Sequence, residues 1–227
     1  MKRQILFNDL VEIAYSENED GNMRFLGEED EQKIIQNQIQ LGKCVGLIGE
    51  NIARINTIYG NRMYFTDYRE VILRNLEKFS IMNSESLIPV SDGIVTRELN
   101  AGILLPLADC LGIVVFDGEN LGLLHAGRQN IEQSGPKKFI EFFAKQFNSK
   151  PENIKVYFSP YALEYHINKL NKNLGEAAKE QLLEAGILPE NITNPQIDTV
   201  KNGQLPSYSN GDKTRRFAII VKRRNNG

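Results

Sequence analysis

The stretch Leu111-Gly112-Ile113-Val114-Val115-Phe116 is followed by Asp117-Gly118-Glu119-Asn120 and then by Leu121-Gly122-Leu123-Leu124. Two nearly continuous apolar runs of this length are typical of strands that are buried on both faces of a sheet. The short polar segment between them contains glycine and is typical of a tight turn. The sequence therefore predicts a buried β-hairpin in the middle of the chain.

Apolar runs and periodic segments on either side of this hairpin predict the remaining elements. Strands are expected at 5–7, 11–15, 44–49, 52–58, 103–105, 154–158 and 217–222, with a hairpin turn at 18–22. Helices are expected at 28–41, at 67–79 with Asp67 as its cap, at 136–147 and at 174–185. Sheets covered by helices are the consistent arrangement, which makes the fold class α/β or α+β.

The composition of the chain excludes several classes of protein. The 227 residues, of which 41% are hydrophobic, suit one globular domain spanning 1–227. A net charge of -2 argues against a nucleic-acid partner bound through a broad basic field. Two cysteines are too few for a disulfide framework and indicate cytosolic thiols. With no signal peptide or membrane span recognised, we expect a cytoplasmic protein without a membrane partner.

A cysteine and a histidine lie at the same end of the predicted hairpin. Cys110 comes seven positions before the turn begins, and His125 comes five positions after it ends. Residues at similar distances from a turn lie opposite one another in an antiparallel pair. A thiol and an imidazole held together suit either a Cys–His nucleophile pair or two ligands of a zinc ion.

The same two residues also permit a simpler interpretation. A lone cysteine beside apolar strands is often an inert buried thiol. Against that, the chain has only two cysteines and two histidines, and one of each converges here. Asp109 precedes Cys110, and an acid at the end of a buried strand needs a partner. Asp109, Cys110 and His125 are therefore the candidate catalytic residues.

Three segments carry a resemblance to a known family. Ser91-Asp92-Gly93-Ile94-Val95-Thr96, Leu107-Ala108-Asp109-Cys110 and His125-Ala126-Gly127 are similar to the patterns D-G-x-V-T, A-D-C-x-P-V and H-A-G-W-R-G. These patterns belong to the laccase-domain proteins, once called multicopper polyphenol oxidoreductases and better described as purine nucleoside phosphorylases. The resemblance implies an α/β/β/α-like sandwich. It also implies phosphate-dependent cleavage of adenosine, inosine or methylthioadenosine, a transferase reaction, and possible deamination of adenosine.

The resemblance also implies a cofactor and a set of binding residues. Members of the family hold one zinc ion through two histidines and a cysteine, two of which correspond to Cys110 and His125. The first histidine corresponds to Tyr59, and tyrosine is an uncommon zinc ligand because its pKa lies near 10. Arg128 and Arg215 could bind phosphate, and Tyr208 could stack on a purine. Each of these three side chains would also be ordinary on a solvated surface.

The departures from the family pattern leave three hypotheses open. The chain is a zinc-dependent phosphorylase-like enzyme, a binding or regulatory protein that has lost catalysis, or a metal-free Cys–His hydrolase. His166 could replace the missing ligand or be a surface residue, and Cys44 is expected in the core. True laccase chemistry is excluded, because a multicopper site needs on the order of ten histidines. The partners implied are a purine nucleoside and phosphate, with a monomer or homodimer both possible.

Overall fold

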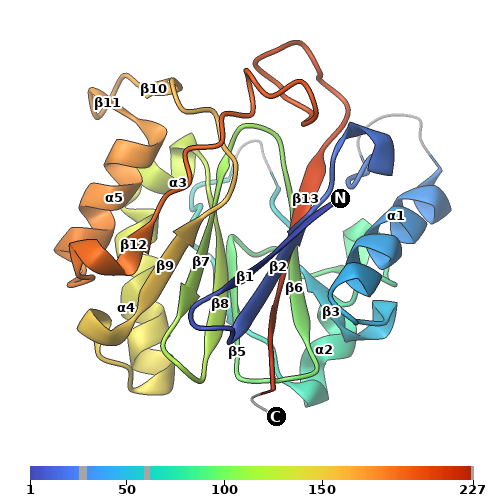
Figure 1. The fold of residues 1–227 in the computed structure, drawn as a ribbon, viewed down its shortest axis with the longest axis horizontal. Coiled ribbons are helices and arrows are strands. Elements are labelled where there is room, and N and C mark those ends of the chain that lie inside the picture. The colour runs from blue at the N-terminus through green and yellow to red at the C-terminus, as the bar shows by residue number, and fades with distance from the viewer. Residues whose placement is uncertain (26–29, 59–61, 226–227) are drawn as a thin grey trace.

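Two β-sheets lie face to face in the computed structural model, and helices cover the outer face of each sheet (Figure 1). The structure describes residues 1–25, 30–58 and 62–225. In Figure 1 the helices of residues 128–184 stand on the left of the sheets, and those of residues 31–79 stand on the right. This order of layers confirms the expected α/β/β/α sandwich.

The strands and helices have the following order and bounds. The five-stranded sheet has the order β1 (Lys2–Leu6), β2 (Val11–Tyr15), β13 (Phe217–Arg223), β6 (Gly102–Leu107) and β3 (Ile52–Arg54). The six-stranded sheet has the order β12 (Ile192–Thr193), β9 (Lys155–Phe158), β7 (Leu111–Phe116), β8 (Leu121–Ala126), β5 (Gly93–Thr96) and β4 (Tyr68–Glu70). A separate small hairpin consists of β10 (His166–Ile167) and β11 (Lys172–Asn173). The α-helices are α1 (Glu31–Cys44), α2 (Leu73–Phe79), α3 (Arg128–Glu132), α4 (Gly135–Phe147) and α5 (Leu174–Glu184).

The central strands are apolar on both faces because each face packs against a different layer. On β7, Val114 and Phe116 belong to the core between the two sheets. Their neighbours Ile113 and Val115 belong to the core beneath α4 and α5. Successive side chains of a strand point to opposite faces, so one continuous apolar run fills two cores. This arrangement is the reason that the sequence shows no polar alternation here.

The predicted hairpin forms with a register that brings the candidate residues together. Gly112 is paired with His125, and Leu111 is paired with Ala126. Cys110 directly precedes Leu111, so it lies two positions from exact register with His125. The prediction that thiol and imidazole share one end of the hairpin is confirmed.

The segment 44–49 was predicted as a strand, and this prediction is wrong. Cys44 is the last residue of α1, and a 3-10 turn follows at Gly49–Asn51. The helix begins with Asp30 as its cap and continues past Leu41, since Lys43 and Cys44 complete its last turn. Cys44 is half-buried rather than part of a core strand, and its Sγ lies 3.1 Å from the Sδ of Met1.

Two further predictions of local structure are corrected. The helix expected at 67–79 is divided into β4 and the shorter α2, because Tyr68–Glu70 pairs in parallel with β5. The hairpin turn expected at 18–22 is a 3-10 turn at Asn18–Asp20, and β2 instead pairs with β1 and β13. In both places the pairing with distant strands outweighs the local turn and capping signals.

No helix within the described residues is both long enough and apolar enough to span a lipid bilayer.

Phe139 of α4 tests how the helix layer is attached to the six-stranded sheet. Its ring is fully buried and packs edge-on against Tyr68, with ring centroids 5.1 Å apart. Two glycines of the sheet make room for it: a Cβ at Gly93 would lie 2.7 Å from the ring, and one at Gly122 would lie 3.1 Å from it. We expect Phe139→Ala to lower the free energy of unfolding by about 3–5 kcal/mol, measured by urea denaturation followed by circular dichroism.

Phe142→Ala on the same helix serves as the control. Phe142 is only partly buried, so its truncation should cost clearly less. Equal losses for the two variants would contradict this account of the attachment.

Candidate functional site

A cavity of about 510 Å³ opens at the end of the β7–β8 hairpin where β7 begins and β8 ends. This volume lies within the usual range for small-molecule sites, roughly 300–1,000 Å³. The side chains and backbone that line it come from segments far apart in the chain: Phe65, Ala108, Asp109, Cys110, His125, Gly127, Arg128, Gln129, Asn130, Tyr165, Leu174, Tyr208, Ser209 and Arg216. Asp109, Cys110, His125, Arg128 and Tyr208, all predicted from the sequence, are therefore brought to one place.

The thiol of Cys110 and the ring of His125 converge at Gly127. A Cβ built on Gly127 would lie 3.2 Å from Cys110 Sγ, 3.0 Å from His125 Cε1 and 3.4 Å from His125 Nε2. Both reactive groups are thus within 3.4 Å of a single point beside the backbone. Glycine at this position leaves the two groups room to face each other and the cavity.

The imidazole of His125 is held neutral at pH 7. The residue is only 4% exposed. Burial, with smaller contributions from the charges of Arg24 and Arg62, lowers the pKa of His125 to about 3. A neutral ring can bind a metal or accept a hydrogen bond through its unprotonated nitrogen, whereas a protonated ring has no nitrogen lone pair for either. The backbone N–H of His125 also donates to the carbonyl of Asp92 at 2.8 Å, which fixes the end of β8.

Asp109 connects the cavity floor to the C-terminal loop. Its carboxylate accepts hydrogen bonds from the hydroxyl of Thr199 at 2.8 Å and from the N–H of Ser209 at 2.6 Å. Its carbonyl accepts from the N–H of Ala162 at 2.9 Å. The backbone of Asp109 has a φ of +74°, which is uncommon for a residue other than glycine. Asp109 therefore sets the turn that presents Cys110.

Tyr208 and Arg216 line one side of the cavity, and Lys213 packs on the Tyr208 ring. Lys213 Nζ lies 3.6 Å from the centroid of the Tyr208 ring, and the Arg216 guanidinium lies 5.9 Å from it. Arg216 lines the cavity, while Arg215 forms an ion pair with Asp212 at 2.7 Å. The sequence pointed to Arg215, and the structure brings its neighbour to the site instead.

Arg128 reaches the cavity from the first turn of α3. Its guanidinium forms an ion pair with Glu132 one turn later, at 3.3 Å, and half of the arginine side chain is exposed. Surface pairs of this kind are worth little. Arg128 can therefore exchange Glu132 for an anionic ligand at small cost.

Tyr59 lies outside the described residues, and His166 belongs to the β10–β11 hairpin. His166 is exposed and its Nδ1 lies 3.4 Å from Asn173 Oδ1, whereas the preceding residue, Tyr165, lines the cavity. Within residues 1–25, 30–58 and 62–225, no three His, Cys, Asp or Glu side chains are grouped so that they could hold a metal ion. Cys110 and His125 are two donors of the types that zinc prefers.

Several residues that line the cavity were not predicted as site residues from the sequence. Phe65, Asn130 and Tyr165 all line the cavity, and Phe65 and Asn130 are buried. Phe65 and Tyr165 sit in irregular segments with no motif. Asn130 follows the His125–Gly127 segment at the position where the family pattern has glycine, and that substitution was the one available signal.

Comparisons with known proteins agree with this architecture. A family model described as multi-copper polyphenol oxidoreductase laccase matches residues 12–169. The hypothetical protein YfiH of Bacillus licheniformis has a similar fold, with a TM-score of 0.80, 15% identity, and coverage of 93% of this chain and 92% of that one. YlmD of Geobacillus stearothermophilus has a TM-score of 0.73 at 18% identity, with 90% and 85% of the two chains covered. Protein NMB0706 of Neisseria meningitidis, from the family DUF152, has a TM-score of 0.72 at 13% identity and 95% coverage of both chains. Among curated protein sequences, none matches this chain.

Asp109→Ala tests whether the acid presents Cys110 to the cavity. Loss of the carboxylate leaves the Ser209 N–H and the Thr199 hydroxyl without their acceptor, which should destabilise the protein by about 1–3 kcal/mol. The turn before Cys110 should loosen at the same time. We expect the rate of Cys110 alkylation by iodoacetamide, followed by mass spectrometry, to change several-fold.

Asp117→Ala is the matched control. The Asp117 carboxylate also accepts several hydrogen bonds, from Asn120, Glu119 and Ser149, but it lies in the turn at the opposite end of the hairpin. It should lower stability and leave the Cys110 alkylation rate unchanged. Identical effects of both variants on Cys110 would show that only global loosening had been measured.

Proposed function

Because the chain belongs to the family described as multi-copper polyphenol oxidoreductase laccase, we propose that it is a purine nucleoside phosphorylase-like enzyme. In this reaction phosphate attacks C1′ of the nucleoside, the N-glycosidic bond breaks, and the base departs with a proton. The products are a pentose 1-phosphate and a free purine. The laccase activity in the family's description does not transfer to this chain, whose two histidines cannot supply a multicopper site.

One observation carries the proposal: a thiol and a neutral imidazole converge on the floor of a cavity large enough for a nucleoside. Groups that are held in the reacting geometry before the substrate binds lower the activation barrier, because less entropy is lost on reaching the transition state. Cys110 is held by the Asp109 turn, and His125 is held by the bond from its N–H to Asp92.

The donor set supports zinc as the cofactor. Thiolate and imidazole are both good zinc ligands, and the buried neutral ring of His125 needs no deprotonation to bind. Cys110 and His125 would hold the ion, with position 59 as the proposed third ligand. When bound, zinc would supply a Lewis acid next to the substrate.

The chain's own residues account for the binding of both substrates. Arg128 and Arg216 present guanidinium groups at the cavity, and guanidinium is the usual partner of phosphate oxygens. Phe65 and Tyr208 present aromatic rings to the same cavity and suit a planar base. Asp109 acts as a positioning residue, because it holds Cys110 on one side and the Tyr208-Ser209 backbone on the other.

A metal-free Cys–His hydrolase is the second candidate. It is favoured by the same convergence of Cys110 and His125, because a thiol beside an imidazole is the arrangement found in Cys–His nucleophile pairs. The lowered pKa of His125 makes its ring a weak base for the thiol proton, which counts against this candidate. Dependence on phosphate separates the two candidates. A phosphorylase releases base only when phosphate is present, whereas a hydrolase uses water.

The activity is tested with the purified protein and adenosine, inosine or methylthioadenosine, with and without phosphate. We expect phosphate-dependent release of the base, measured by liquid chromatography, with any inosine formed from adenosine scored as deamination. Cys110→Ser and His125→Ala should each reduce kcat/KM by about 100-fold or more. Cys44→Ser, which alters the half-buried cysteine of α1, should keep the activity. Equal rates without phosphate would favour the hydrolase, and no turnover of any substrate would favour a binding protein.

Zinc binding is tested separately with Gly127→Ala. The added Cβ would press on both Cys110 Sγ and His125 Cε1, so the affinity for zinc should fall by about tenfold or more. The measurement is competition with a chromogenic chelator. Gly203→Ala is the control, because a Cβ there meets nothing within 4 Å. Zinc affinity that is equal in both variants and in the unaltered chain would contradict a site at this position.

A further inference from the structure

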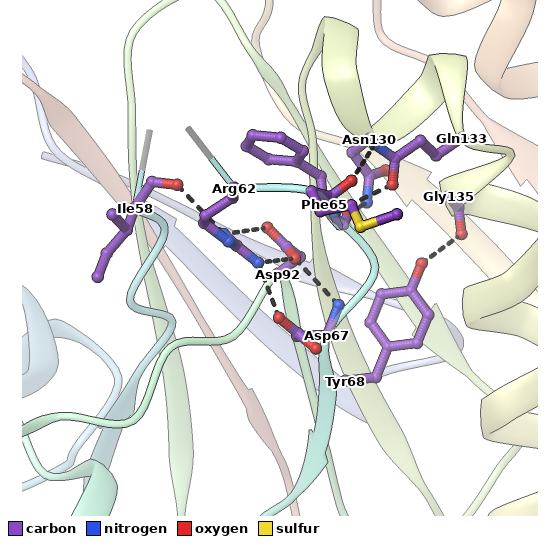
Figure 2. Close-up of polar contacts among 10 residues, drawn as sticks. Ile58, Arg62, Phe65, Asp67, Tyr68, Asp92, Asn130, Gln133 and Gly135 are labelled. Atoms are coloured by element: carbon purple, nitrogen blue, oxygen red, sulfur yellow. Dashed lines mark hydrogen bonds and ion pairs between the residues drawn. The ribbon is translucent and has the colours of Figure 1, made fainter. Parts of the chain in front are cut away.

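Asp92 belongs to the Ser91–Thr96 motif but has no role in the reaction proposed above. It is 1% exposed, and both of its carboxylate oxygens are occupied. Arg62 donates to Oδ2 at 2.9 Å and to Oδ1 at 3.3 Å, and the N–H of Asp67 donates to Oδ2 at 3.0 Å. This bidentate pairing fixes the plane of the Arg62 guanidinium as well as its position. Figure 2 shows the Arg62 guanidinium bonded to the carboxylates of both Asp92 and Asp67.

The backbone of Asp92 is bound to the elements on both sides of it. Its carbonyl accepts the His125 N–H at 2.8 Å, and its N–H donates to the Asp67 carbonyl at 2.7 Å. Asp92 therefore joins the strand end that carries His125 to the segment that leads into β4. These bonds use the backbone of Asp92 and not its carboxylate, so they remain when the ion pair with Arg62 is lost.

Arg62 extends the same network along the loop that precedes β4. Besides Asp92, it donates to Asp67 Oδ2 at 2.9 Å and to the carbonyl of Ile58 at 3.2 Å. Its guanidinium carbon lies 4.9 Å from the centroid of the Phe65 ring. The Arg62 side chain thus bonds to both Ile58 and Asp67 and covers the Phe65 ring.

The segment of α3 and its C-cap bonds to the same loop, at residues 63–65, from the side opposite Arg62. Gln133 accepts the N–H of Phe65 at 3.0 Å and donates to the carbonyl of Met63 at 3.3 Å. Asn130 donates to the carbonyl of Phe65. Both backbone groups of Phe65 are therefore paired, one with Asn130 of α3 and the other with Gln133, the C-cap of α3, as Figure 2 shows. Helix α3 starts directly after the His125–Gly127 segment.

The outcome of these contacts is that Phe65 faces the cavity. It is 6% exposed and lines the cavity, whereas the adjacent Tyr64 is 61% exposed and points to solvent. The loop has no strand or helix pairing of its own that would determine whether Tyr64 or Phe65 turns inward. The contacts with Arg62 on one side and with Asn130 and Gln133 on the other determine it.

We propose that Arg62 and Asp92 are positioning residues that hold Phe65 as the wall of the cavity, and that the planar base of the substrate packs on this wall. The identity of the base rests on the proposed function. The placement of Phe65 by the ion pair does not, because it requires only the cavity. Loss of the pair should therefore weaken binding of the nucleoside and leave the reacting groups Cys110 and His125 in place.

The placement is tested by fluorescence. The chain has no tryptophan, so Phe65→Trp introduces a single reporter into the wall. Adding Arg62→Ala should shift its emission to longer wavelength and raise the acrylamide quenching constant by about twofold or more. Arg62→Lys should change the emission and the quenching constant less, because an ammonium keeps the charge but cannot make the bidentate pair.

Arg97→Ala is the matched control in the same Phe65→Trp background. Arg97 also pairs with an acid, Glu70 at 3.3 Å, and also lies over a phenylalanine, Phe147 at 5.2 Å, but neither residue lines the cavity. It should leave the reporter unchanged. The proposal would be overturned if Arg62→Ala left the tryptophan emission and quenching unchanged, or if Arg97→Ala changed them equally.

Kinetics on the chain with Phe65 intact provide the second measurement and do not depend on the tryptophan variant folding. Arg62→Ala should raise KM for the nucleoside by about tenfold, with kcat and KM for phosphate changed by less than about twofold. A fall in kcat with KM unchanged would contradict a role in holding the base. If the unaltered chain releases no base from any nucleoside, the proposed function fails, and the fluorescence experiment still decides whether Arg62 and Asp92 place Phe65.

Discussion

The antiparallel pairing of β7 with β8 is the constraint on which the rest of the site depends. The register that sets Gly112 against His125 also sets the position of Cys110 relative to Gly127. A slip of one residue would turn His125 to the opposite face of the sheet and bury it beneath the other layer. Both faces of these strands pack into apolar cores, so such a slip would expose or misplace every side chain of the hairpin. Hydrophobic packing thus fixes the register that brings Cys110 and His125 together, and the hydrogen bonds of Asp109 and Asp92 then fix the ends of the two strands.

The sequence was most informative where a segment is buried on both faces. The runs in β6, β7, β8 and β13 are so apolar that few alternatives to a central strand exist, and the structure has strands at all four. It was least informative where local signals and long-range pairing compete. Asp67 looks like a helix cap followed by an acid, yet Tyr68–Glu70 pairs with β5 and Asp67 binds Arg62. Cys44 sits in an apolar segment that resembles a strand, yet the preceding helix continues through it.

The same distinction applies to the site. Cys110 and His125 were recognisable because one hairpin carries both, and hairpin geometry can be inferred from sequence separation. Phe65 and Arg216 reach the cavity from segments about 150 residues apart, and only the completed fold brings them together. Arg215 and Arg216 could not be distinguished from the sequence, because the choice depends on a bond from Asp212 and on the path of an irregular loop. Loops carry much of the binding surface in many folds and have the weakest sequence patterns.

The place of β13 has a consequence for how the chain comes to be folded. This strand is late in the sequence, yet it lies between β2 and β6 in the middle of the five-stranded sheet. While the chain is being synthesised, β2 and β6 have no partner between them until residues 217–223 have left the ribosome. The six-stranded sheet needs only residues up to about 193 and can pair earlier. The apolar face of the six-stranded sheet, which packs on β6 and β13 in the finished fold, therefore stays exposed until residues 217–223 have been synthesised. During this interval the nascent chain is most prone to aggregate and has most need of a chaperone.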